Sequence, residues 1–144
     1  MPLVSKLKII NMENNNPIKE LTKAEEQVMQ ALWKIKKGFV NDILEEFPNP
    51  KPAYNTFSTI VRILVKKGFV NYNAYGKSHE YYPLISKKEY TSAFLNGFLS
   101  GYFSNSYKQL VSFFSKENNL SIEELEEIRA IMDEQIEKQT NQQE

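Results

Sequence analysis

The sequence contains no cysteine, and its only histidine is His79. Disulfides, thiolate nucleophiles and zinc sites made of cysteine and histidine are therefore excluded. Glycine-rich phosphate loops and paired histidine ligands are also missing, and no motif brings a serine, a histidine and an aspartate together, so neither an enzyme nor a bound cofactor is predicted. No stretch approaches the ~20 consecutive apolar residues of a membrane span, and the first residues lack the apolar run of a signal peptide. We therefore predict a soluble, cytoplasmic protein without membrane contact.

Charge is balanced overall but unevenly distributed along the chain. The 144 residues carry 18 basic and 18 acidic side chains. Residues 1–92 hold 14 basic against 9 acidic side chains, a balance of +5, and residues 93–144 hold 4 against 9, a balance of −5. The first part can therefore face a polyanion such as DNA while the second stays away from it. The length suits one domain, or a small domain with an appended piece.

The stretch from Ala53 to Gly68 predicts a helix with two different faces. Apolar residues recur at helical spacing on one face: Tyr54, Phe57, Ile60, Val61, Leu64 and Val65. The opposite face is polar: Asn55, Ser58, Thr59, Arg62 and Lys66. Short hydrogen-bonding groups near the helix start and cations farther along suit the reading of base edges and the binding of phosphates. An ordinary solvated helix face has the same pattern, so the neighbouring segments decide between the two.

Two shorter helices are predicted before this stretch. Thr22 and Glu25 fit a capping box that opens the first helix, and Gly38 is expected to end it. The second helix covers residues 39–47, and the prolines at 48, 50 and 52 leave a tight connection of the kind found in a helix-turn-helix. Residues 1–17 show no hydrophobic period and are predicted to form a disordered arm, in which Lys6 and Lys8 are candidate phosphate contacts.

After Gly68 the apolar period changes to that of strands. Two short strands flank a turn with Gly76 and Lys77, which predicts a hairpin. The order of three helices and a two-stranded hairpin is that of a winged helix-turn-helix, whose third helix enters the major groove of DNA. The hairpin is then a wing along the phosphate backbone, with a plain hairpin as the alternative. His79 falls on its second strand, where a surface or packing role is expected.

The remaining chain, residues 86–138, is predicted to be a helical domain, followed by a tail at 139–144. Two neighbouring rows form a wide apolar stripe on its first helix: Phe94, Phe98 and Tyr102, and Leu95, Leu99 and Phe103. A second helix carries Tyr107, Leu110, Val111 and Phe114. Ser121 and Glu124 fit another capping box, which opens a last helix with Ile122, Leu125, Ile128 and Met132 directed inward. A partner subunit is the expected cover for the stripe, with an effector pocket or a membrane surface as alternatives.

Four stretches, taken in order, carry the residues of a known family of regulators. They are LTKAEEQVMQALWK, NTFSTIVRILVKKGFV, GKSHEYYPL and LSIEELEEIRAIM. Across about residues 18–135 they resemble the penicillinase repressor family, the BlaI/MecI-type bacterial regulators. The sharpest similarities are the pair Thr56 and Thr59, the helix end at 66–68 with Lys66, Lys67 and Gly68, and the wing residues Gly76, Lys77 and Tyr81.

The resemblance implies a dimeric repressor of antibiotic resistance genes, with the winged helix on DNA and a helical dimerisation domain. The chain departs from the family pattern in three places. Family members usually carry a basic residue between the two threonines, where this chain has Ser58, and Arg62 can supply the charge one turn later. Copper-responsive relatives carry C-terminal cysteines, whose absence here excludes metal sensing of that kind. Family induction is tied to proteolytic cutting, commonly at an Asn-Phe bond, and the matching position here is Ala93-Phe94.

The first hypothesis is therefore a mainly α-helical protein with a small β-hairpin wing: a winged helix-turn-helix at residues 18–85 and a helical dimerisation domain at 86–138. It binds a pseudopalindromic double-stranded operator as a homodimer and controls a resistance or stress gene, with an inducing protease as a further partner. The base-facing residues are Asn55, Thr56, Ser58, Thr59 and Arg62; the phosphate contacts are Lys66, Lys67 and Lys77; the dimer interface comprises Phe94, Leu95, Phe98, Leu99, Tyr102, Phe103, Leu125, Ile128 and Met132. The alternatives are a ligand-sensing winged-helix regulator of another family, with its effector pocket in the aromatic C-terminal core, and a winged helix used only for protein contacts.

Overall fold

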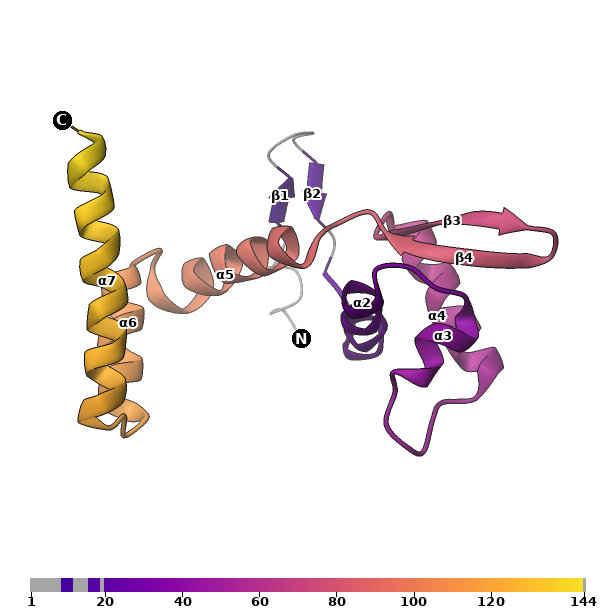
Figure 1. Cartoon of the computed structure of the whole chain (residues 1–144), viewed down its shortest axis with the longest axis horizontal. Helices are drawn as coiled ribbons and strands as arrows, with labels where there is room; N and C mark the ends of the chain where they lie inside the picture. Colours follow the sequence, from indigo (N-terminus) through magenta and orange to yellow (C-terminus); the bar gives the residue numbers. More distant parts are fainter. Residues whose placement is uncertain (1–8, 12–15, 19, 144) are drawn as a thin grey trace.

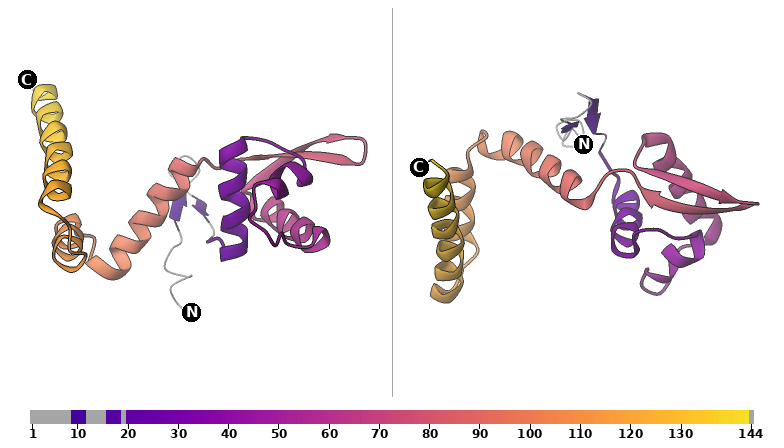
Figure 2. Two further views of the ribbon diagram at one scale, coloured as in Figure 1. Left: turned by 60° about the horizontal axis from the view of Figure 1, so that its bottom comes forward. Right: turned by 45° about the horizontal axis from the view of Figure 1, so that its top comes forward.

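The computed structural model describes residues 9–11, 16–18 and 20–143 of an elongated molecule (Figure 1). In chain order its elements are β1 (Ile9–Asn11), β2 (Asn16–Ile18), α2 (Lys23–Ile35), α3 (Val40–Glu45), α4 (Tyr54–Lys67), β3 (Val70–Tyr75), β4 (Ser78–Pro83), α5 (Lys87–Phe103), α6 (Tyr107–Glu117) and α7 (Ile122–Gln142). The helices α2 to α4 and the hairpin β3–β4 lie at one end, α6 and α7 lie at the other, and α5 connects the two (Figure 2). The order of elements confirms the winged helix-turn-helix.

The first helix, α2, begins with the predicted capping box. Thr22 Oγ1 accepts from the Glu25 amide at 3.2 Å, and Glu25 Oε1 accepts from the Thr22 amide at 2.9 Å. The prediction that Gly38 ends this helix is wrong, because the chain leaves it at Lys36, whose φ is 75°. Gly38 instead pairs with Tyr81 of β4 through backbone bonds of 2.9 and 2.8 Å. A Cβ at this position would lie only 2.8 Å from Ile35 Cδ1.

Helices α3 and α4 form the helix-turn-helix, and both match their predicted places. Asp42 Oδ2 caps α3 by accepting from the Phe39 amide at 2.9 Å. α4 ends at Gly68, which has the left-handed φ of 84° that favours glycine at a helix end. The cap fixes the direction in which the chain leaves α4 for the hairpin.

The hairpin β3–β4 is antiparallel and confirms the predicted wing strands. Val70 pairs with Pro83 at its base, and Tyr75 pairs with Ser78 at its tip. Only Gly76 and Lys77 connect the strands, and the φ of Gly76 is 63°, as such a tight turn requires. The hairpin therefore projects from the helices as a narrow two-stranded ribbon (Figure 1).

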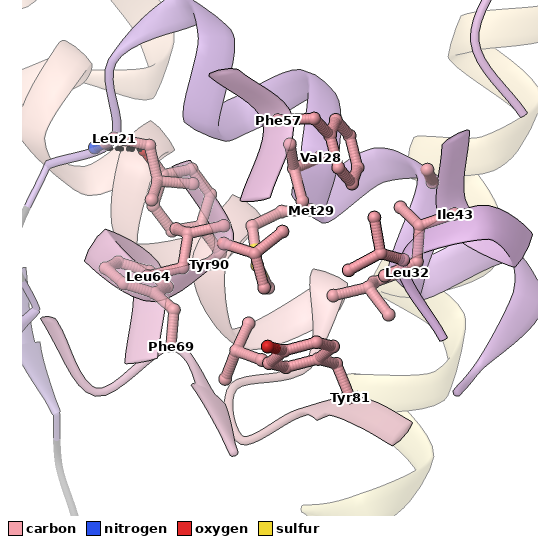
Figure 3. Packing of buried hydrophobic residues seen from close by; sticks show 14 of the residues in the cluster. Leu21, Val28, Met29, Leu32, Ile43, Phe57, Leu64, Phe69, Tyr81 and Tyr90 are labelled. Carbon is pink, nitrogen blue, oxygen red and sulfur yellow. Dashed lines mark hydrogen bonds between the residues drawn. The ribbon is translucent and has the colours of Figure 1, made fainter. Parts of the chain in front are cut away.

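The core lies between α2, α3, α4 and the base of the hairpin (Figure 3). Its largest fully buried side chains are Phe57, Phe69, Met29, Leu32, Ile43 and Leu64. Tyr54 was predicted to belong to this core, but 53% of its surface is exposed. The first residue of α4 that belongs to the core is Phe57, one turn after Tyr54. The Phe57 ring packs edge-on against Phe47 of the α3–α4 turn, with ring centroids 5.3 Å apart. Tyr54 therefore lies outside the core.

The first turns of α5 pack in the core of the winged helix, beyond the predicted boundary after residue 85. Tyr90 and Ala93 are buried in the same core cluster as α2 and α4. The Tyr90 ring lies 5.9 Å from both the Trp33 and the Phe69 rings, and its hydroxyl accepts from the Leu21 amide at 3.4 Å. α5 therefore leaves the winged helix as a continuous rod rather than after a linker.

Helices α6 and α7 form the far end of the molecule and match the predicted positions. Ser106 and Ser121 cap them, and Ser121 Oγ accepts from the Glu124 amide at 3.0 Å, which is one of the two bonds of the predicted box. Within the single chain, no residue of α7 is buried, so the side chains predicted to point inward are at most partly covered. Those of Ile122, Leu125 and Met132 are exposed, and Ile128 is half-buried.

The N-terminal segment differs from the predicted disordered arm, because β1 and β2 pair as antiparallel strands. The pairs run from Ile9 with Ile18 to Asn11 with Asn16, and β1 lies beside α5. The candidate phosphate contacts Lys6 and Lys8 lie outside the described residues. Within the described ranges, none of the helices combines the length and the apolar character needed to cross a lipid bilayer.

Candidate nucleic-acid interface

The exposed face of α4 carries mainly polar and cationic side chains, with Ile63 as a partly exposed apolar residue, and the helix has no acidic residue. Asn55, Thr56, Thr59 and Arg62 are exposed, and Ser58 is half-buried, as the sequence predicted for a polar face. The N-cap Ala53 offers no side-chain hydrogen bond to the first turn. The first backbone N–H groups of α4 and the positive end of its dipole are therefore available to an anion.

Hydrogen bonds within α4 orient two of the base-facing candidates. Thr59 Oγ1 donates to the Asn55 carbonyl at 2.9 Å, so its hydroxyl proton is engaged and its lone pairs are free to accept from a base amino group. Arg62 Nε lies 3.5 Å from the Ser58 carbonyl, which leaves the two terminal nitrogens of the guanidinium free. This arrangement fits bidentate contact of Arg62 with a guanine edge or a phosphate.

A hollow of about 800 Å³ lies between α3, α4 and the wing. Its lining residues are Phe39, Val40, Asn41, Asp42, Tyr54, Ser58, Arg62, Tyr75, Lys77, Ser78, His79 and Tyr81. Arg62 of α4 and Lys77 of the wing turn place cations on two of its walls. Asp42 is its one acidic side chain, and one of its oxygens is engaged by the Phe39 amide. The hollow therefore offers positive charge and hydroxyl groups to a nucleic-acid strand lying between α4 and the wing.

The two lysines at the end of α4 have different surroundings. Lys66 is exposed, as a phosphate contact requires. Lys67 instead forms an ion pair with Glu25 at 2.6 Å, and its Nζ also donates to the Glu20 carbonyl at 3.4 Å. Consecutive helical residues differ in direction by about 100°, so Lys67 points back toward the start of α2. The pair favours a structural role for Lys67 over the predicted phosphate contact.

Aromatic side chains stiffen the wing. The rings of Tyr72 and His79 stack at 4.0 Å and 7°, and Tyr81 packs edge-on against Tyr72. His79 therefore packs on the wing, as expected. Burial raises the pKa of Tyr81 above its ordinary value, Tyr72 and Tyr54 add to this effect, and Arg62 opposes it. The Tyr81 hydroxyl accordingly stays neutral and adds no negative charge to the hollow.

Sequence reasoning did not assign most of the residues that line the hollow to the site. The polar ones among them include Asn41 and Asp42 of α3, Tyr54 of α4, and Tyr75 and Ser78 of the wing. The signal for Tyr54 was present, because Tyr54, Ser58 and Arg62 form one row at i, i+4 and i+8 of α4. The wing residues depend on a contact between Phe39 and Tyr75, whose rings lie 6.0 Å apart. No local pattern in the sequence indicates that contact.

The predicted dimer residues of α5 form a continuous row that the chain itself leaves partly open. The rings of Phe94, Phe98 and Tyr102 follow each other at 6.5 and 5.3 Å, and Phe94 and Tyr102 remain 42% and 54% exposed. Leu95, Phe98 and Phe103 are half-buried, whereas Leu99 is only 4% exposed. Leu99 is thus covered within the chain, unlike the rest of the row.

The predicted cleavage bond lies inside α5. Ala93 is 4% exposed and packs in the core of the winged helix, while the next residue, Phe94, opens the aromatic row. Both backbone groups therefore belong to a packed helix. The described residues contain no group of three or more histidine, aspartate or glutamate side chains able to hold a metal ion.

Comparison with known proteins identifies the family. The sequence model described as penicillinase repressor matches residues 21–134. The methicillin resistance regulatory protein MecI of Staphylococcus aureus (strain N315) is 29% identical over 119 residues, which cover 82% of this chain and 97% of MecI. The penicillinase repressor of Bacillus licheniformis is 27% identical over 118 residues, which cover 81% of this chain and 92% of that repressor. The solved DNA-binding domain of the repressor BlaI is 27% identical, with a TM-score of 0.44 over 50% of this chain and 89% of that domain. The chain belongs to the penicillinase repressor family.

Proposed function

We propose that this repressor binds a pseudopalindromic DNA operator as a homodimer, with α4 in the major groove and the wing on the phosphate backbone. The observation that carries the proposal is the acid-free exposed face of α4, which opens onto a hollow with cations on two walls. Phosphate contacts supply most of the affinity of such proteins, and base edges supply specificity. The relatives are named for methicillin resistance and penicillinase, so we place a resistance or stress gene under its control.

The residues have two roles on the helix and wing, and Arg62 takes part in both. Asn55, Thr56, Ser58, Thr59 and Arg62 approach the bases from the first turns of α4. Lys66 at the end of α4 and Lys77 in the wing turn hold phosphates. Arg62, which lines the hollow together with Lys77, takes the role predicted for Lys67. Tyr54 and the free amides at the start of α4 add hydrogen bonds to the phosphates of the DNA.

The uncovered apolar surface of α5 and α7 supports dimerisation. The exposed apolar side chains include Phe94 and Tyr102 on α5, and Ile131, Met132 and Ile136 on α7. A second copy of the chain covers such a surface and brings two winged helices to two half-sites. Linking the half-sites multiplies the affinity through effective concentration.

Induction by a protease is consistent with the position of the bond between Ala93 and Phe94. A cut there separates the winged helix from the aromatic row, so each half-site loses its tether. Because Ala93 is buried and both residues are helical, the cut requires local unfolding of α5.

The proposal is tested by comparing variants on DNA selected by the protein from a random pool and on unselected DNA of equal length. Thr59→Ala should weaken binding to selected DNA by roughly 1–3 kcal/mol per subunit and binding to unselected DNA far less. Lys116→Ala, which removes an exposed lysine on α6, is the matched control and should change neither. If Thr59→Ala weakened binding to both DNAs equally, this face of α4 would not recognise bases.

The homodimer is tested separately by sedimentation. The double variant Phe94→Lys and Tyr102→Lys should sediment as a monomer at micromolar concentration and should lose most of its affinity for the selected DNA. Leu84→Lys, at an exposed apolar position outside the row, is the control and should remain dimeric. A monomeric unmodified protein would contradict the proposal.

A further inference from the structure

The turn between α3 and α4 is long and poor in hydrogen-bond donors. α3 ends at Glu45 and α4 begins at Tyr54, so residues 46–53 form the turn, whereas helix-turn-helix turns commonly have 3–4 residues. Pro48, Pro50 and Pro52 occupy three of its positions and have no backbone N–H. A turn of this length and composition does not fix the distance between the two helices by backbone bonds alone.

The C-terminal carbonyls of α3 need more partners than the backbone of this turn supplies. The last four carbonyls of any helix lack intrahelical donors. The Glu46 amide reaches the Ile43 carbonyl at 3.1 Å, and the Phe47 amide reaches the Leu44 carbonyl at 3.0 Å. The next residue is Pro48, which ends the series of backbone donors.

The side chain of Lys51 completes this end of α3. Its Nζ lies 3.2 Å from the Leu44 carbonyl, 3.2 Å from the Glu45 carbonyl and 2.9 Å from the Phe47 carbonyl. An ammonium has three hydrogens, so these three bonds use all its donors. The positive charge also lies at the negative end of the α3 dipole, where it is stabilising.

One of these contacts leads directly to the DNA-facing helix. Lys51 holds the backbone of Phe47, and the Phe47 ring packs at 90° against Phe57 of α4. Phe57 is fully buried, and Ser58 and Thr59 of the polar face follow it in the same helical turn. The position of Phe47 therefore influences how α4 presents its polar face relative to α3.

We propose that Lys51 is a positioning residue, which folds the long turn back onto α3 and so fixes α4 for base recognition without contacting DNA itself. This inference rests on the proposed DNA binding. It gives Lys51 a different role from Lys66 and Lys77, although all three are exposed lysines of the winged helix. A phosphate contact would require Lys51 to release the carbonyls, because its three donors are already used.

The DNA arm of the test compares Lys51→Met, which keeps the chain length without donors, with Lys51→Arg, which keeps donors and charge. Lys108→Met, on α6, is the control. Lys51→Met should weaken binding to selected DNA about tenfold, the effect of losing roughly 1.4 kcal/mol of hydrogen bonding. Its salt slope should equal that of the unmodified protein, and Lys51→Arg should restore most of the affinity. Equal losses on both DNAs, with a slope smaller by about 1 per subunit, would overturn the proposal in favour of a phosphate contact.

The second arm uses the full-length protein without DNA, so its result is independent of the proposed function. In ¹H–¹⁵N spectra, the Lys51 ammonium should exchange its protons more slowly than that of Lys108, and the Phe47 amide should lose protection in Lys51→Met. Equal exchange at the two lysines would refute the cap itself. A protected ammonium with unchanged affinity in Lys51→Met would refute its positioning role, and an unmodified protein that fails to discriminate DNAs would count against the proposed function instead.

Discussion

The strongest structural prediction concerns where the DNA-binding domain ends. A fragment of residues 1–84 keeps every predicted element of the winged helix, whereas a fragment of residues 1–96 also keeps the first turns of α5. The shorter fragment loses Tyr90, which is 7% exposed between Trp33 and Phe69. It also loses Ile85, whose carbonyl accepts from Trp33 Nε1 at 2.8 Å.

The magnitude follows from these contacts. Removing a buried aromatic side chain costs about 3–5 kcal/mol, and losing a hydrogen bond costs about 1 kcal/mol. Since small domains have about 5–15 kcal/mol of total stability, the fragment ending at residue 84 should be close to unfolding at room temperature. The fragment ending at residue 96 should unfold cooperatively.

The assay is urea unfolding followed by the fluorescence of Trp33, which is the only tryptophan and lies against Tyr90. Tyr90→Phe in the longer fragment is the control. It keeps the ring contacts and removes only the 3.4 Å bond from the Leu21 amide, so it should cost at most about 1 kcal/mol. Equal urea midpoints for the two fragments would show that α5 does not stabilise the winged helix and would refute the reasoning.

Three further predictions follow from the ion pair between Lys67 and Glu25, the half-buried carboxyl of Glu20 and the cleavage position. Lys67→Met should lower the free energy of unfolding by about 2 kcal/mol, because it leaves Glu25 buried without its partner, while Lys66→Met should leave stability unchanged and reduce the salt slope of DNA binding by about 1 per subunit. Burial raises the pKa of Glu20, and Lys67 opposes this shift, so the folded state favours the protonated form and stability is lost as the pH rises above 4.5. Glu20→Gln should therefore raise the free energy of unfolding at pH 7, and this gain should vanish in acid. Urea titrations at several pH values measure the difference. In limited proteolysis the bond Ala93–Phe94 should be cut more slowly than bonds in exposed loops, and rapid cutting there in the intact protein would contradict the packing of α5.

Local signals in the sequence were sufficient for the helices and the wing. The capping box at Thr22, the glycines at 68 and 76 and the change of apolar period after residue 68 each depend on neighbouring residues only, and all have the predicted place. The polar face of α4 follows from the same periodicity. These features could be predicted because their energetics are contained within a few turns of chain.

The features that sequence reasoning missed depend on distant contacts. Lys67 is paired with a carboxylate 42 positions earlier, and Gly38 with a strand residue 43 positions later. Tyr54 fits an apolar period, but the core ends one turn after it. Tyr90 and Ala93 lie at i and i+3 on α5, yet the exposed aromatic rows that follow give a stronger signal. No periodicity indicates which part of a helix packs against a neighbouring domain.

The central claim, DNA binding through α4 and the wing of a dimer, is tested most directly by the salt dependence of affinity. The measurement is fluorescence anisotropy of the unmodified protein on its selected DNA between low and moderate salt. Arg62, Lys66 and Lys77 in two subunits give six phosphate-side cations, for which the slope of log K against log salt should be about −5. A slope near zero, or equal affinity for selected and unselected DNA, would contradict the account.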